Sequence, residues 1–160
     1  MNKDKQVSTK YLQYRDQVLA YTNQDMNLTL DNDEQVYIAV FDIPVKSGLI
    51  GFRTQTLALV FGLNTHIYHG SGRTMTNLEK DPKVMKAMQS LLISSHQVLK
   101  SMELVDNTDY YTSKNVRAYL KTRKGIHFKE LKKGIKEDEF LMALMNYVLK
   151  EIAESQGKTT

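Results

Sequence analysis

The residues best suited to binding chemistry lie in one basic segment, 113–136. This segment holds nine Lys or Arg side chains and a single acidic residue, Glu130, which gives it a formal charge of +8. The whole 160-residue chain carries only +4. Acidic residues flank the segment on both sides: Glu103, Asp106, Asp109, Glu137, Asp138 and Glu139. A cluster bounded in this way produces a local positive field, to which phosphate groups bind with release of counterions.

Four of these basic residues, Lys114, Arg117, Lys121 and Lys124, are spaced by 3, 4 and 3. On a helix over 113–122 this spacing places them on one face, and nearby aromatic rings are able to stack on unpaired bases. We therefore predict contact with nucleic acid or another polyanion. The predicted phosphate contacts are Lys114, Arg117, Lys121, Arg123, Lys124, Lys129 and Lys132, and the predicted stacking or packing residues are Tyr111, Tyr119 and Phe128. The competing interpretation is a solvated lysine-rich face that only keeps the protein soluble.

A second candidate site is the run HIYHGSGR at 66–73. Its glycines allow successive backbone N–H groups to point into one concavity, which suits a phosphate or a carboxylate. Asp42 is the carboxylate within a strongly apolar stretch, and burial raises the pKa of a carboxyl group toward general acid or base use. The weaker hypothesis is thus a small-ligand site or an enzyme built from Asp42, Arg53, His66, His69, Ser71 and Arg73. The simpler interpretation is a turn after an edge strand, with Asp42 capping a turn.

Metal, cofactor and thiol chemistry receive no support from the sequence. The chain has no cysteine, which excludes thiolate metal sites, disulfides and cysteine nucleophiles. His66 and His69 stand three apart on a predicted strand and so point to opposite faces. We predict no metal site and no cofactor, and we favour a non-catalytic binding protein over an enzyme.

The first half of the chain predicts a helix followed by strands. Val7, Tyr11, Tyr14, Val18 and Tyr21 step by 4, 3, 4 and 3, which indicates an amphipathic helix over about 6–24, with Ser8 or Thr9 as its cap. β-Branched and aromatic runs predict strands at 35–43, 50–61 and 65–69, and Pro44 is expected to end the first. Gly62-Leu63-Asn64 is predicted to be a hairpin turn, so the strands form an antiparallel meander.

The second half is predicted to be helical. Asp81 and Pro82 begin a helix expected to reach about residue 103, a shorter helix is expected at 113–122, and one or two turns at 127–133. A last helix is expected to end near residue 154. The predicted fold class is α+β, with an N-terminal helix packed on an antiparallel meander of three or more strands, followed by a helical C-terminal half. Residues 1–160 are expected to form one domain, with a helical sub-lobe at 104–160 as the alternative.

The last helix is apolar around more than half of its circumference, through Phe140, Leu141, Met142, Leu144, Met145, Tyr147, Val148, Leu149 and Ile152. Such a helix is central in its own domain or shared with a partner. The alternative function is therefore a homodimeric protein-interaction module that does not bind nucleic acid. The polar start of the chain and the lack of an apolar span predict a cytoplasmic protein with no membrane contact, whose partner is a nucleic acid, an acidic protein or a second copy.

Overall fold

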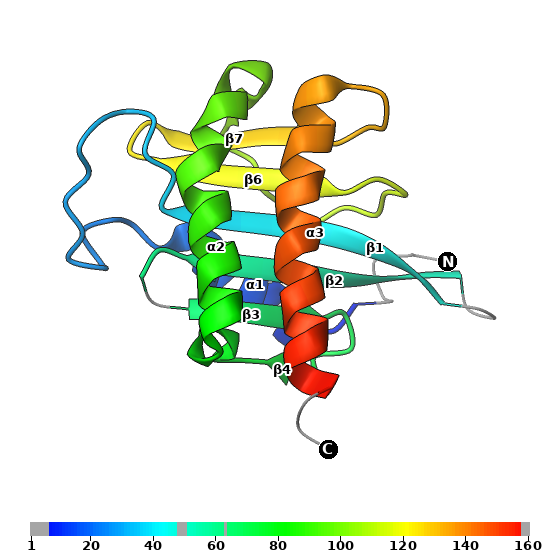
Figure 1. The fold of residues 1–160 in the computed structure, drawn as a ribbon. Coiled ribbons are helices and arrows are strands. Elements are labelled where there is room, and N and C mark those ends of the chain that lie inside the picture. Colours follow the sequence, from blue (N-terminus) through cyan, green and yellow to red (C-terminus); the bar gives the residue numbers. More distant parts are fainter. Residues whose placement is uncertain (1–6, 48–50, 63, 158–160) are drawn as a thin grey trace.

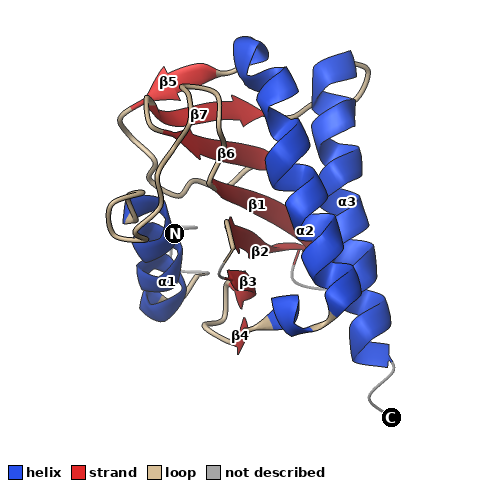
Figure 2. Ribbon diagram, turned by 60° about the vertical axis from the view of Figure 1, so that its left-hand side comes forward, coloured by secondary structure: helices blue, strands red, loops and turns tan. Residues whose placement is uncertain are grey.

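The chain forms one antiparallel sheet with helices on both faces (Figures 1 and 2). This computed structural model describes residues 7–47, 51–62 and 64–157, without the side chains of 46, 47 and 51–53. Within these residues, seven strands pair antiparallel in the order β4-β3-β2-β1-β6-β7-β5. The strands are β1 (Ile38–Ser47), β2 (Gly51–Val60), β3 (Asn64–His69), β4 (Thr74–Met75), β5 (Glu103–Val105), β6 (Arg117–Thr122) and β7 (Gly125–Glu130).

The helices make the outer layers. The short helix α1 (Thr9–Ala20) lies on one face of the sheet, and α2 (Pro82–Ser94) and α3 (Lys136–Gly157) lie side by side on the other (Figure 2). The 3-10 helices η3 (Leu78–Lys80) and η4 (Ser95–Ser101) adjoin the two ends of α2. No helix in the described ranges is long and apolar enough to cross a bilayer.

Strand β1 shows how the sheet supplies two cores. Its alternate residues Ala39 and Phe41 pack in the core beneath α2 and α3, whereas Ile38 and Val40 pack in the core beneath α1. All four are fully buried. The apolar side chains on both sides of this strand, from which a doubly covered strand is predicted, therefore serve two separate layers.

The predicted fold class is confirmed: an N-terminal helix packs on an antiparallel sheet, and α2 and α3 follow. The predicted helix caps are also confirmed. Ser8 Oγ accepts a hydrogen bond from the Tyr11 N–H at 3.0 Å, and Asp81 accepts one from the Lys83 N–H at 2.8 Å. Leu63, at the centre of the predicted hairpin turn, lies outside the described residues.

The predicted helix at 113–122 and the predicted turns at 127–133 are wrong. Residues in these ranges form β6 and β7, joined at Gly125, whose φ of +131° is a conformation that other residues rarely adopt. Ala118 and Leu120 point into one core and Tyr119 into the other, so the period is 2 rather than 3.6. Burial of these alternate side chains outweighs the helix propensity of alanine, leucine and lysine.

Pro44 does not end β1, contrary to the prediction. The strand continues to Ser47 while pairing with β2, where Pro44 lies opposite Thr54. The pairing of β1 with β6 stops at Asp42, opposite Arg117. Beyond Asp42 the β6 side of β1 is an open edge, and a proline that lacks an N–H group is tolerated at such an edge.

Candidate functional site

Side chains of β6 alternate between the two faces of the sheet, and this alternation separates the cations of the basic segment. Arg117, Tyr119 and Lys121 lie on the α1 face of the sheet, but Tyr119 between the two basic residues is only 2% exposed. Burial raises the pKa of Tyr119 to about 12, so its hydroxyl stays protonated near neutral pH. The strand therefore leads to two different regions, a buried charged row at Arg117 and an open hollow beyond Lys121.

The open region, here called the hairpin hollow, lies between the β6–β7 turn and the loop that follows α1. Its volume is about 820 Å³. The lining includes three cations, Lys121, Arg123 and Lys124, and no Asp or Glu. The other lining residues are mainly polar: Thr22, Asn23, Gln24, Asn27, Leu28, Thr29, Leu30, Tyr37, Thr122 and Gly125. Amides, hydroxyls and cations that converge in this way are suited to an anionic ligand.

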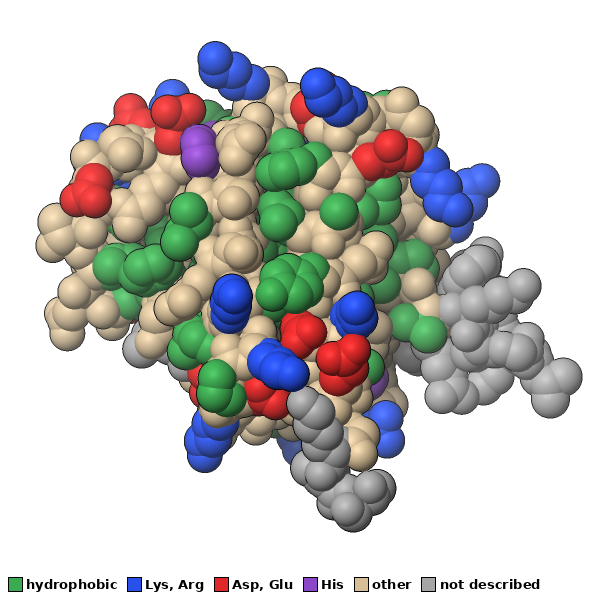
Figure 3. Space-filling model, in the orientation of Figure 1, with side chains coloured by type: hydrophobic (Ala, Val, Ile, Leu, Met, Phe, Trp, Pro, Cys, Tyr) green, Lys and Arg blue, Asp and Glu red, His purple; other side chains and the backbone are tan. Residues whose placement is uncertain are grey.

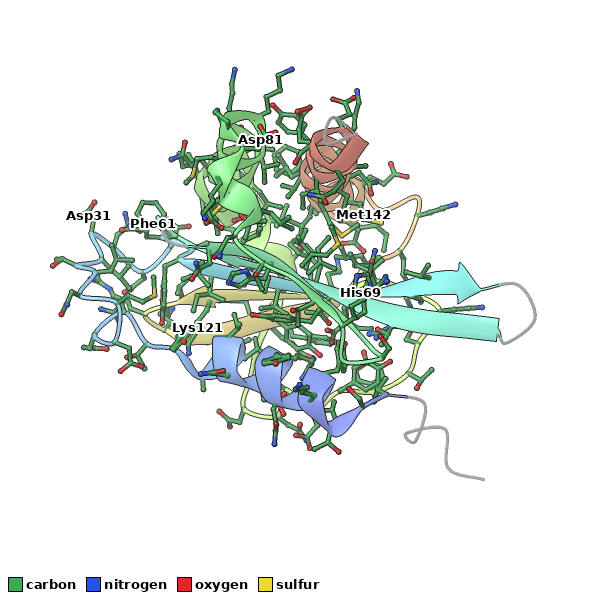
Figure 4. All side chains as sticks on the ribbon, turned by 90° about the horizontal axis from the view of Figure 1, so that it is seen from below. Asp31, Phe61, His69, Asp81, Lys121 and Met142 are labelled. Carbon is green, nitrogen blue, oxygen red and sulfur yellow. The ribbon has the colours of Figure 1, made fainter. Side chains whose placement is uncertain are left out.

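Lys121 joins the hairpin hollow to the end of α1. Its ammonium Nζ donates to the carbonyl oxygens of Leu19 at 2.7 Å and Tyr21 at 2.5 Å. These carbonyls belong to the C-terminal end of the helix, which carries partial negative charge. Burial lowers the pKa of Lys121, while the carboxylate of Asp25 opposes that shift. Figure 4 shows Lys121 beside this end of α1.

Arg123 and Lys124 are the more accessible cations of the hollow. Arg123 Nε donates to Asp33 Oδ1 at 2.6 Å, but both side chains are about half exposed, at 46% and 57%. An exposed pair of this kind contributes little free energy, so an anion is able to compete for the guanidinium. The side chain of Lys124 is exposed. Its backbone N–H donates to Thr122 Oγ1 at 3.2 Å, which fixes the turn.

The opposite wall of the hollow is the loop at 22–30, whose shape is fixed by hydrogen bonds within the loop. Thr22 and Asp25 bond reciprocally: the Thr22 N–H donates to Asp25 Oδ2 and the Asp25 N–H donates to Thr22 Oγ1. Asn23 Nδ2 donates to the carbonyl of Leu28 at 3.1 Å. Asn27 takes a positive φ of 52°, which asparagine tolerates better than most residues. The polar wall is thus shaped by short-range bonds and does not depend on a ligand.

The remaining predicted phosphate contacts do not join this hollow. Arg117 is 1% exposed and is covered by the segment that precedes β6. Lys129 Nζ is paired with Asp138 at 2.7 Å, on the side of the sheet where α3 begins. Lys114 and Lys132 are exposed but lie outside the hollow lining. Because the helix that aligned them is wrong, the expected single face of cations is replaced by one local group, Lys121, Arg123 and Lys124.

The buried region is a row of side chains aligned across the strands. Strand pairing places Thr56 opposite Asp42, Asp42 opposite Arg117, and Arg117 opposite Glu130. From α1, Arg15 reaches Asp42 with its Nε 3.0 Å from Oδ2 and its Nη2 2.9 Å from the same oxygen. Arg15 and Asp42 are both 0% exposed. Burial tends to lower the pKa of Arg15, but Asp42 raises it above its usual value.

A hydroxyl relay completes the shell around Asp42. Thr56 Oγ1 donates to Asp42 Oδ1 at 2.7 Å, so its single proton is used there. Tyr11, whose Oη is 2.5 Å from Thr56 Oγ1, must therefore be the donor in that bond. Burial, reinforced by the charge of Asp42, raises the pKa of Tyr11 above its usual value. The carboxylate is satisfied by protein groups, which is the arrangement of a structural ion pair.

The segment before β6 closes the row. The Tyr110 ring centroid lies 5.8 Å from Arg15 Cζ and 5.6 Å from Arg117 Cζ, so both guanidinium groups are within cation–π distance of this ring. Arg117 Nη1 donates to the carbonyls of Ser113 at 3.0 Å and Asn115 at 2.8 Å. Glu130 accepts hydrogen bonds from the Tyr111 and Ser113 hydroxyls and from Asn115 Nδ2. Of the predicted stacking residues, Tyr119 is thus buried in the core beneath α1, whereas Tyr111 is exposed and bonded to Glu130.

The residues of the second predicted site are separated. Asp42 and His66 lie on the α1 face, and His69 lies on the other face, as its strand spacing predicts. His66 Nδ1 accepts from the Asn77 N–H at 3.1 Å, and burial lowers the pKa of both histidines. Ser71 and Arg73 are exposed, and the side chain of Arg53 lies outside the described residues. In the described ranges no group of three His, Asp or Glu residues is arranged to hold a metal ion.

Sequence reasoning missed Arg15 and the polar wall of the hollow. Arg15 stands four residues after Tyr11 and three before Val18, so a charged residue inside the apolar stripe of α1 was the available signal. The loop residues Asn23, Gln24 and Asn27 gave only a turn signal. Comparison of the chain with known protein families, curated proteins and solved structures finds no match.

Proposed function

We propose that the protein is a non-catalytic binding protein that contacts the phosphate backbone of a nucleic acid through the hairpin hollow. The observation that carries this proposal is the lining itself, which contains Lys121, Arg123 and Lys124 and no carboxylate. The hollow adds amide and hydroxyl groups from Thr22, Asn23 and neighbouring residues. Such groups bond to phosphate and sugar oxygens without reading the base sequence.

The geometry favours contact with phosphates over contact with bases. Tyr119 is buried, and the hydroxyl of Tyr111 is bonded to Glu130 at 2.9 Å, outside the hollow. Tyr37, which lines the hollow, is 2% exposed. Stacking on bases therefore has little support in this region. Binding is expected to depend strongly on salt and weakly on sequence.

The test is fluorescence anisotropy of labelled single-stranded DNA and RNA at several salt concentrations. Neutralisation of three phosphates on a single strand predicts a slope of log K against log salt of about −2. The double variant Arg123→Glu/Lys124→Glu is expected to weaken binding at low salt by about tenfold or more. Its matched control is Lys132→Glu/Lys133→Glu, which makes the same change in charge at exposed residues outside the hollow.

Two results would overturn the proposal: no binding of either strand at low salt, or an equal loss of affinity in the hollow variant and its control. An equal loss would show that only the net charge matters. Competition by inorganic polyphosphate and by heparin separates nucleic acid from other polyanions. If either competitor displaces the strand at equal charge concentration, the site is a general polyanion site.

A further inference from the structure

Helix α3 carries a second, outward stripe that does not contact the sheet. One side of the helix packs on the sheet through Leu141, Met145, Val148 and Ile152, all nearly or fully buried. The outward stripe is exposed along its length and is spaced by 4, 3, 4, 3 and 4: Lys136, Phe140, Ala143, Tyr147, Lys150 and Glu154. This is the heptad spacing by which two helices pack along a common seam.

The chemistry of the stripe changes along the helix. Phe140 and Tyr147 are each 38% exposed and flank the small residue Ala143, so the centre is apolar. Charged residues of opposite sign stand at the ends, Lys136 at the start and Glu154 near the finish. The ion pairs among the described residues use none of these side chains. Figure 3 shows hydrophobic side chains along this face, with charged groups above and below them.

We propose that a second copy of the chain docks here, with the two α3 helices antiparallel about a two-fold axis. In an antiparallel pair centred between positions 143 and 147, Lys136 meets the partner's Glu154, and Phe140 meets the partner's Lys150. Ala143 meets the partner's Tyr147. The symmetry repeats each contact, so every charged end residue faces an opposite charge or an aromatic ring.

The self-complementarity favours a second copy over an unrelated partner. A stripe with an apolar centre and like charges at both ends would repel itself, whereas this one pairs with its own reverse. The small Ala143 allows the helices to approach closely near the axis, where the partner's Tyr147 packs over it. One flanking contact is unfavourable, because Glu137 approaches the partner's Glu151. The dimer is therefore expected to be weak and to form at high protein concentration.

Sedimentation velocity from micromolar concentration to about 1 mM tests the dimer. Lys136→Glu and Glu154→Lys each place like charges together twice per dimer and are expected to weaken it about tenfold. The combined variant Lys136→Glu/Glu154→Lys restores opposite charges and is expected to recover the dimer. Lys133→Glu, an exposed residue off the stripe, is the charge-matched control and should change the dimer little.

A monomer throughout this range overturns the proposal. So does a dimer that survives both single reversals, since another face must then hold it, or a combined variant no better than either single one. The residues are exposed, so the variants are expected to fold, and their far-ultraviolet circular dichroism checks this. Arg123→Glu/Lys124→Glu should leave the dimer intact, because the hairpin hollow is separate from the stripe.

Discussion

Strand β6 links two regions that use the same residue types in opposite ways. At its start Arg117 lies in a row with Arg15, Asp42 and the part-buried Glu130, where two cations stand beside two carboxylates. At its end Lys121 opens onto the hairpin hollow, whose lining has no carboxylate. Both ends of this strand belong to the basic segment of the sequence. The cations of the first region have buried or part-buried carboxylate partners, whereas in the second Arg123 is paired only with the exposed Asp33.

The difference comes from what covers the sheet at each end. Over Arg117, the segment before β6 supplies two carbonyl groups and the Tyr110 ring, and that ring also contacts Arg15 of α1. Over the β6–β7 turn, α1 has already ended at Ala20, and only a polar loop faces the cations. A cation covered by other parts of the chain needs an internal partner, whereas one at an open turn remains available to a ligand.

Asp42→Ala is expected to produce the largest effect on stability. It removes the buried carboxylate of Arg15 and leaves only the exposed Asp16, whose Oδ1 lies 2.8 Å from Arg15 Nη1. Loss of one member of a buried pair typically costs about 3–5 kcal/mol of the free energy of unfolding. Urea denaturation followed by circular dichroism measures this change. A cost below about 1 kcal/mol would mean that Asp16 or solvent compensates Arg15 for the lost carboxylate, and that the row is more open to solvent than its burial indicates.

The double variant Arg15→Met/Asp42→Leu is the control for that result. Apolar replacement of a whole buried pair is often neutral or stabilising, so most of the lost free energy should return. If the double variant is as unstable as Asp42→Ala, then Thr56 and Tyr11 need the carboxylate itself, through the hydroxyl relay described above.

Lys121→Met is expected to have the second-largest effect on stability, and it also tests binding in the hairpin hollow. It removes two charge-assisted hydrogen bonds to the end of α1 while keeping the alkyl chain, which should cost about 1–2 kcal/mol because the group is only half-buried. The same change is expected to weaken binding of single-stranded nucleic acid. Paired measurements by urea denaturation and by anisotropy check both effects. A loss of binding without a loss of stability would place Lys121 in the hollow alone.

Glu130→Gln should have a smaller effect that depends on pH. Burial tends to raise the pKa of Glu130, but hydrogen bonds from Ser113, Tyr111 and Asn115 outweigh it and lower the pKa below its usual value. A carboxylate with a lowered pKa stabilises the fold above its unfolded-state pKa and loses that contribution as pH falls through the folded-state value. The wild type should therefore lose more stability than the variant between roughly pH 5 and pH 3. Thermal melts across this range measure the difference, and parallel curves would contradict it.

Lys124→Glu should leave the free energy of unfolding within about 0.5 kcal/mol of the wild type, since the side chain is exposed. Its effect is expected in binding only. A marked loss of stability, measured by urea denaturation, would break the comparison, because the hollow would then contain a structural cation as the buried row does.

The sequence predicts the apolar elements better than the charged ones. Period-3.6 and period-2 patterns identify α1, the first three strands and α3, because burial of a face determines them. The spacing of Lys114, Arg117, Lys121 and Lys124 resembles a helix face, although the alternation of Ala118, Tyr119 and Leu120 shows the strand that actually forms. The spacing of these cations thus fits a helix by chance, whereas the burial of alternate apolar side chains determines the strand.

The two regions also differ in how far each follows from local sequence. The Asp42–Arg15 contact joins residues 27 positions apart on different elements. The local sequence around either residue does not predict the other as its partner. The hollow needs the loop at 22–30 to face a turn about a hundred residues later. Such pairings are decided by topology. The basic segment contains the three cations that line the hollow, but its spacing suggested the wrong secondary structure for them.

The cross-strand row has a consequence for how the chain folds. If β1 slipped by one residue against its neighbours, Asp42 would turn into the apolar layer beneath α2 and α3. An apolar side chain, Phe41 or Ile43, would then face Arg15. An intermediate with this mispaired strand would thus bury unpaired charges in an apolar core and would be unstable. We therefore expect the row to disfavour slipped registers while the sheet assembles.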